Sequence, residues 1–192
     1  MYWNILYNPL SKFSEKSLFV FGIVATFIGS FIGYYCGVTY DGVLDTHIRS
    51  RTFWESFSEN LVNIASVFLA LIILGKIINP KTRMVDVFNI AMLSRIPIYI
   101  GATFVNNPMM NNINQQIMES IQDVENLTFE LMDLLFLIVF SSILLLLMVW
   151  QIILMIFGFR TATNLKKWQY WVVFGFMLIL AEIFSKYLIG II

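Results

Sequence analysis

Five apolar stretches, separated by short polar segments, dominate the pattern of this 192-residue chain. A helix that crosses a bilayer needs about 20 mostly apolar residues. We therefore expect spanning helices over about 17–40, 60–78, 87–105, 128–159 and 169–192, preceded by a lead-in at 1–16. The pattern predicts an all-α fold, a polytopic integral membrane five-helix bundle that forms a single membrane domain over 1–192.

The polar segments alternate between basic and acidic. The N-terminus and the 2–3 and 4–5 gaps hold most of the cations, which are Lys12, Lys16, Lys76, Lys81, Arg83, Arg160, Lys166 and Lys167. The 3–4 gap has no Lys or Arg and carries Glu119, Asp123, Glu125, Glu130 and Asp133. Because basic loops stay in the cytoplasm, the N-terminus is expected to be cytoplasmic and the C-terminus extracytoplasmic.

The two gaps on the acidic side are expected to contain interfacial helices. In the 3–4 gap, apolar residues recur at helical spacing after the turn-forming Asn106-Asn107-Pro108, at Met110, Ile113, Ile117, Ile121 and Val124. In the 1–2 gap, the apolar residues Ile48, Phe53, Trp54 and Phe57 predict a second, shorter interfacial piece.

Composition agrees with a lipid environment and excludes several functions. Hydrophobic residues make up 59% of the chain and charged residues 12%, against about 25% charged in soluble domains. The net charge is zero, so no nucleic-acid partner is expected. The single cysteine, Cys36, cannot form an internal disulfide. No phosphate loop, nucleophile elbow, zinc-protease motif or cofactor fingerprint is present, so we expect no catalysis and no cofactor.

A strip of small residues runs along the first predicted helix, with Gly22, Gly29, Gly33 and Gly37 close to one face. Glycines four residues apart allow another helix backbone to approach closely. Two readings stay open at this point: packing within one bundle, or pairing with a second copy of the chain.

Charged groups inside predicted spans are the candidate binding residues. Arg95 lies about 13 Å into the third span, and Pro97 is expected to kink that helix. A charge at this depth needs a partner. Arg95 is therefore expected to form a structural ion pair, to contact an anion or lipid headgroup, or to snorkel to the interface from a more tilted helix. Glu182 in the fifth span is the candidate partner, although Lys186 follows it at i+4. We expect Arg95 and Lys186 to share Glu182, and Arg95→Ala to be more harmful than Lys186→Ala.

Other polar groups in the apolar stretches are expected to form hydrogen bonds between helices. They are Asn63, Ser66, Asn89, Ser141, Ser142 and Gln151. Asp41, Asp45 and His47 follow the first span, and their spacing matches no standard metal site. We therefore expect a solvated loop there, and no metal.

The chain resembles the Yip family, the Ypt/Rab-interacting membrane proteins and their bacterial relatives. The lead-in Asn8-Pro9, Phe13 and Glu15-Lys16 is similar to that of the bacterial branch. Within the spans, the similar positions are Gly29, Gly33, Gly75-Lys76 and Ser94-Arg95-Ile96-Pro97. The resemblance implies a non-enzymatic five-helix bundle in a bacterial cytoplasmic (inner) membrane. It departs from the eukaryotic branch, since the long acidic or Pro-rich arm and the Asp-Leu-Tyr-Gly-Pro motif are missing, so Rab binding is not implied.

The resemblance also implies that the lead-in lies along the lipid surface. Its apolar residues are Trp3, Ile5, Leu6, Pro9, Leu10 and Phe13, with Lys12 and Lys16 at the headgroups. We expect a multi-pass membrane scaffold or interaction protein, with membrane lipids, other membrane proteins or a second copy as partners. The alternative is a small transporter or lipid- or ion-binding permease that uses Arg95, Glu182 and the Pro97 kink, and a weaker one is a lipid-modifying enzyme.

Overall fold

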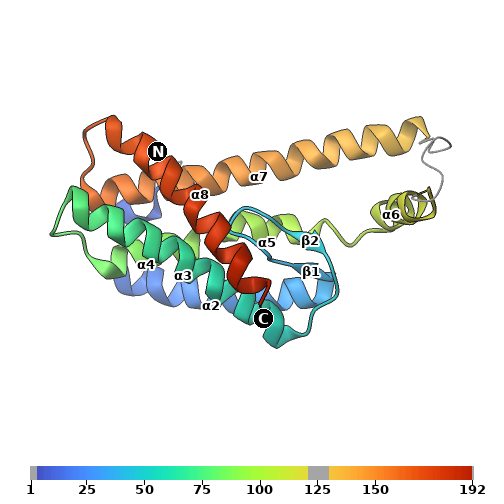
Figure 1. Ribbon diagram of the computed structural model, residues 1–192, viewed down its shortest axis with the longest axis horizontal. Coiled ribbons are helices and arrows are strands. Elements are labelled where there is room, and N and C mark those ends of the chain that lie inside the picture. Colours follow the sequence, from blue (N-terminus) through green and yellow to red (C-terminus); the bar gives the residue numbers. More distant parts are fainter. Residues whose placement is uncertain (1–3, 121–129, 192) are drawn as a thin grey trace.

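The computed structural model describes residues 4–120 and 130–191, which are mostly α-helical (Figure 1). Five stretches are long and apolar enough to cross a membrane: α2 (Glu15–Cys36), α3 (Phe53–Ile78), α4 with α5 (Met84–Thr103), α7 (Leu131–Thr163) and α8 (Gln169–Ile189). Large apolar side chains cover their outer faces; Val20, for example, is 61% exposed and Leu146 68%. Outward-facing apolar surface on this scale is typical of helices surrounded by lipid.

The first two spans differ from their expected bounds because of their caps. Ser14 caps the start of α2, and Gly37, at φ 64°, ends that helix four residues earlier than expected. Thr52 and Glu55 form a capping box at the start of α3, seven residues before the expected beginning. The shorter interfacial piece expected in the 1–2 gap is therefore wrong, since Phe53 and the aromatic residues after it form the first turns of α3.

The third span is interrupted at its centre. It consists of α4 (Met84–Leu93) and α5 (Ile96–Thr103), joined by the turn Ser94–Arg95. Pro97 lies in the first turn of α5, where the missing N–H of proline costs little because first-turn N–H groups have no partner in the helix. This arrangement leaves the Arg95 side chain at the break.

α6 (Pro108–Ser120) is the amphipathic helix expected in the 3–4 gap. The Asn107 side chain accepts the backbone N–H of Met110 at 2.9 Å, and Ile113 is fully buried. Ile121, Asp123, Val124 and Glu125 lie outside the described residues, as do Trp3 and the ends of the expected spans at 128–129 and 192. Figure 1 shows α6 at the far end of α7, beyond the other helices, and Gln116 donates to Asp133 there at 3.4 Å.

The core lies around α3, which packs against α2, α4 and α8. Its fully buried centre includes Val67, Leu71, Met155 and Phe159. By contrast, α7 is about 50 Å long, more than the roughly 30 Å of a hydrocarbon core, and its first half projects beyond the bundle (Figure 1).

The lead-in packs against α7. It forms α1 (Asn4–Tyr7) and the 3₁₀ turn η1 (Pro9–Ser11). The Trp150 indole donates to the Leu6 carbonyl at 2.7 Å, and the Asn8 amide donates to Thr161 at 2.9 Å. The lead-in is thus part of the bundle and not only a surface helix, although Leu6 and Phe13 remain about half exposed.

The glycine strip of α2 faces other parts of the same chain. A Cβ added at Gly22 would lie 2.8 Å from Met92 of α4, and one at Gly29 would lie 2.5 Å from the Tyr99 ring of α5. Gly33 faces Ser56 and Tyr40 in the same way. Close helix approach inside the bundle therefore occupies this strip, while Gly37 serves as the left-handed cap of α2.

Candidate functional site

The loop between α2 and α3 folds back into the bundle. β1 (Val38–Thr39) and β2 (His47–Ile48) pair antiparallel and make residues 38–48 a hairpin, whose tip we define as residues 40–44. Tyr40 and Val43 at the tip are fully buried. The Tyr40 hydroxyl donates to the Gly29 carbonyl at 2.8 Å, about two turns below the end of α2. We call this hairpin a re-entrant loop because its irregular backbone folds back among the candidate membrane spans.

Arg95 holds the tip through its backbone. The side chain is fully buried, and its Nη1 donates to the carbonyls of Val43 at 2.6 Å and Gly42 at 3.2 Å. Its Nη2 donates to Asn60 at 3.4 Å. Non-helical backbone survives in a membrane only where protein groups satisfy it. A guanidinium, with five fixed donors, can satisfy several carbonyls at once.

The expected sharing of Glu182 between Arg95 and Lys186 is wrong on the Arg95 side. Glu182 lies 3.4 Å from Lys186, and its other oxygen accepts the backbone N–H of Leu44 at 2.8 Å. None of the ion pairs among the described residues joins Glu182 to Arg95. The tip of the hairpin lies between Arg95 and Glu182. Its carbonyls accept hydrogen bonds from Arg95, and its Leu44 N–H donates to Glu182.

Uncharged residues also donate hydrogen bonds to the tip. The Gln151 amide donates to the Val43 carbonyl at 2.8 Å, and the Asn63 amide donates to the Tyr40 carbonyl at 2.6 Å. These two side chains come from α7 and α3, so spans on several sides of the tip contribute. The tip is therefore bound through main-chain groups, and Asn63 and Gln151 link this loop to the helices instead of linking two helices. Of the other polar residues expected to do so, Asn89 does link α4 to α2, whereas Ser66 and Ser142 donate to carbonyls of their own helices.

Gly42 brings the tip into close contact with the Glu182 carboxylate. A Cβ added at Gly42 would collide with the Glu182 carboxylate. Because of this close approach, Glu182 accepts a hydrogen bond from the Leu44 N–H while Arg95 donates one to the Gly42 carbonyl. A small residue at this point is what allows two oppositely charged side chains to bind neighbouring parts of one loop.

A second charged group holds the base of the hairpin. Glu59 is 2% exposed and lies 2.8 Å from Arg51. Its oxygens accept the Thr39 hydroxyl at 2.7 Å and the Tyr40 N–H at 3.0 Å. The buried carboxylate is thus paired and hydrogen-bonded, which is the condition for a stable charge away from water.

Aromatic rings face the guanidinium. The Arg95 carbon Cζ lies 5.6 Å from the centroid of the Tyr40 ring and 6.0 Å from that of Tyr99. These distances are within the range of cation–π attraction, which is strongest where water is excluded. Carbonyl dipoles and ring faces therefore stabilise the buried charge, while the Arg95 Nε has no hydrogen-bond partner among the described residues.

Asp41, Asp45 and His47 gather on the open side of the hairpin, with ligand atoms within 4.8 Å of one another. His47 lies 2.7 Å from Asp41, and Asp45 pairs with Lys186. Burial raises the pKa of the Asp45 carboxyl, but the hydrogen bond and charge of Lys186 outweigh it and hold that pKa below its ordinary value. The pair with Lys186 fastens the hairpin to α8.

The re-entrant loop is the element that sequence reasoning missed. The segment is rich in charge, with Asp41, Asp45, Arg49 and Arg51, and such density is typical of a solvated loop. A signal was available in the apolar Val38, Tyr40 and Val43 and in the small Gly37 and Gly42 among those charges. Neutral amides at span depth, Asn60, Asn63 and Gln151, were the matching signal on the helices.

Fold and interior together define an α-helical protein, with candidate membrane spans built around a re-entrant loop. Comparison of the chain with protein-family models, with curated proteins and with solved structures gave no match. The function therefore has to be argued from the geometry of this interior.

Proposed function

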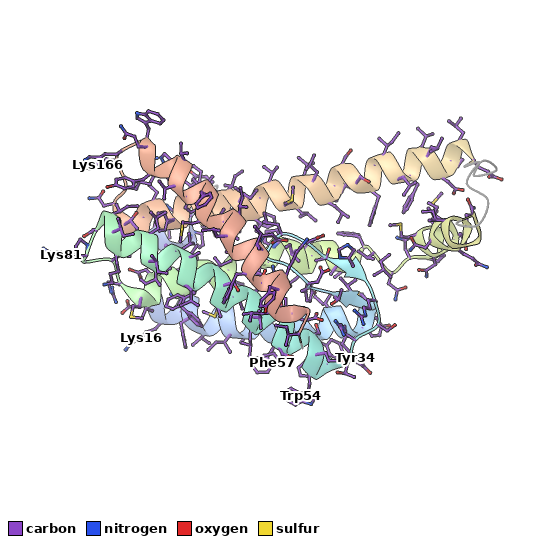
Figure 2. All side chains as sticks on the ribbon, viewed as in Figure 1. Lys16, Tyr34, Trp54, Phe57, Lys81 and Lys166 are labelled. Atoms are coloured by element: carbon purple, nitrogen blue, oxygen red, sulfur yellow. The ribbon has the colours of Figure 1, made fainter. Side chains whose placement is uncertain are left out.

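We propose that the protein is a non-enzymatic, multi-pass scaffold or interaction protein of the Yip type in a bacterial cytoplasmic membrane. Its five candidate spans support the multi-pass part of the proposal. Lys16, Lys81 and Lys166 lie at one end of the molecule, and Tyr34, Trp54 and Phe57 lie toward the other (Figure 2). Because positive charge stays inside, this arrangement favours a cytoplasmic N-terminus and an extracytoplasmic C-terminus.

The observation that carries the proposal is the state of Arg95. A charge that binds substrate must face a cavity or a water path. Arg95 is instead 0% exposed, and its guanidinium binds carbonyls of the chain's own loop. The intramembrane charge therefore serves the architecture of the bundle, which leaves the outer surfaces for function.

The projecting half of α7 is the surface best suited to interaction. In an 18-residue apolar stretch of α7, only 6% of the residues are buried inside the molecule, against 50% in the corresponding stretch of α3. Leu131, Ile138 and Leu146 are among its most exposed side chains, at 71%, 63% and 68%. We place protein contacts there, together with the basic loops at the cytoplasmic end and the acidic 3–4 gap.

A small transporter is the second candidate function. A groove of about 330 Å³ runs beside the hairpin and is lined by Asp45, Thr46, Pro97 and Ser141, among others. It reaches the loop at Leu44, the residue after the Val43 carbonyl that Arg95 binds. If the tip leaves its place during a cycle, the donors of Arg95 and the carboxylate of Glu182 lose their loop partners and could bind a solute.

Thiol labelling at the tip separates the two candidates. In a Cys36→Ser background, Val43→Cys places a thiol at the buried tip and Ser50→Cys places one at the exposed end of the same loop. A scaffold with a permanent seat predicts that a membrane-impermeant maleimide labels the Ser50→Cys variant at once, and the Val43→Cys variant only after denaturation in SDS. Labelling of the Val43→Cys variant at a rate within tenfold of the other would instead support the transporter.

Reporter fusions test the membrane orientation independently. Fusions that end after Lys81 should report the cytoplasm, and fusions that end after Asp123 should report the opposite side. Both reporters in one compartment would refute the proposed threading.

A further inference from the structure

An apolar groove of about 380 Å³ opens on the side of the bundle at its lysine-rich end. The lead-in forms one wall with Leu6 and Pro9, α2 forms another with Leu18 and Phe21, and α7 contributes Trp150. Ser17 is the one residue with a polar side chain, apart from the Trp150 indole N–H, among the described residues that line it. The indole nitrogen is already bound to the Leu6 carbonyl, so its ring presents an apolar face.

The groove ends at the helix break. Leu93 and Ile96, the residues on either side of Ser94–Arg95, line it. The residue that holds the tip, Arg95, and the groove therefore share this turn of backbone. What fills the groove packs against the same turn that positions the Arg95 side chain.

The chemistry of the lining selects the occupant. Water enters a cavity only where it finds two to four polar partners, and this groove offers almost none. A helix from another protein is about 10 Å in diameter with its side chains, so a groove of about 380 Å³ is too small to contain one. At about 30 Å³ for each water-sized group, the groove holds about a dozen such groups, which is roughly one alkyl chain.

Charge at the mouth selects the headgroup. Lys12 and Lys16 are exposed, and they are adjacent in sequence to Phe13 and Ser17, which line the groove. Lysines at a membrane surface attract anionic lipids. The described residues that line the groove include no charged side chain, and the nearby Glu15 is paired with Arg83, so Lys12 and Lys16 supply the preference for a negative headgroup.

We infer that this groove binds one acyl chain of an anionic phospholipid from the leaflet that contains the lead-in, with the phosphate at Lys12 and Lys16. The inference rests on the membrane placement proposed above. Lipid in the groove stabilises the lead-in on α7 and supports the turn that carries Arg95.

Fluorescence quenching tests the site. Trp150 is kept as the single tryptophan, with phenylalanine substituted at Trp3, Trp54, Trp168 and Trp171. The protein is reconstituted in phosphatidylcholine vesicles in which a small fraction of the lipid is brominated, either as phosphatidylglycerol or as phosphatidylcholine. The matched control carries Leu146→Trp and Trp150→Phe, which places the single tryptophan one turn away on α7, where the native side chain is 68% exposed.

Brominated phosphatidylglycerol should quench Trp150 several times more strongly than brominated phosphatidylcholine, and Lys12→Gln with Lys16→Gln should lower the apparent affinity about tenfold. Equal quenching by the two lipids, or none, would overturn the inference. The control should be quenched equally by both lipids. That result reports membrane placement alone, so the site can fail while the proposed function stands. Native mass spectrometry of the unmodified protein, showing one retained anionic lipid, checks the result without substitutions in the groove.

Discussion

Replacing Arg95 with methionine should unseat the re-entrant loop while leaving the helices in the membrane. The substitution removes donors from two backbone carbonyls, those of Gly42 and Val43. Gln151 still donates to the Val43 carbonyl at 2.8 Å, so the Gly42 carbonyl and, at the longer distance of 3.4 Å, the Asn60 side-chain oxygen are the acceptors that lose Arg95. Insertion of the third span becomes easier, because a charge at the bilayer centre costs about 3 kcal/mol.

The magnitude for seating the loop follows from these bonds. A hydrogen bond to a charged group contributes about 1.5–3 kcal/mol, and a buried carbonyl without a partner costs about 1–3 kcal/mol. Because one carbonyl keeps a partner, we expect seating to weaken by about 2–4 kcal/mol. At 1.4 kcal/mol for each factor of ten, this is a rise of about 30- to 1,000-fold in the exposed fraction of the tip.

The assay is maleimide labelling of Val43→Cys in the Cys36→Ser background, with and without Arg95→Met. The control is Arg83→Met, which removes a largely exposed pair with Glu15 that does not involve the hairpin and is worth about 0–1 kcal/mol. We expect that control to raise labelling less than about fivefold. Equal effects of the two substitutions, or no measurable rise for Arg95→Met, would refute the assignment of Arg95 as the residue that holds the tip.

Two further predictions concern packing and pH. Gly29→Ala should lower the melting temperature of the detergent-solubilised protein, because the new Cβ lies 2.5 Å from the Tyr99 ring and overpacking costs about 1–3 kcal/mol. Gly175→Ala should leave the melting temperature unchanged, because no other atom lies within 4 Å of the added Cβ. Equal melting temperatures of the two variants would contradict the packing argument. The pKa of Asp45 is lowered in the folded protein, so its pair with Lys186 stabilises the hairpin above the unfolded pKa of about 4 and is lost as pH falls through the folded value. Hydrogen exchange of residues 44–48, corrected for its intrinsic pH dependence, should speed up on acidification, and Asp45→Asn should abolish that dependence; an unchanged profile in the variant would argue against it.

The candidate spans could be predicted from the length of their apolar runs, and the amphipathic α6 from the helical spacing of its apolar residues. Pro108 at the start of α6 and the buried Ile113 follow from turn chemistry and helical spacing. The start of α3 was misplaced because Glu55 and Glu59 reduce the hydropathy of its first turns. Their hydrogen bonds to Thr52 and to the hairpin, which the hydropathy pattern does not reveal, make them part of the helix.

The partner of Arg95 could not be predicted because most of its acceptors are backbone carbonyls. A search of the sequence for a charged partner finds only side chains, so it finds Glu182. The tertiary structure instead places the loop tip between the two charges, and each binds the tip. The position of a charged residue along a helix predicts its depth, but it does not predict which loop packs against that residue in the folded protein.

The way the tip is held has a consequence for how the chain is made. The ribosome completes residues 40–44 long before it reaches Gln151 and Glu182, which supply two of the tip's bonds. Until the last span emerges, the Leu44 N–H would have no carboxylate to meet, and hydrocarbon does not tolerate such a group. In the proposed membrane placement, we therefore expect the hairpin to stay in the aqueous compartment during translation and to insert as the closing step of assembly.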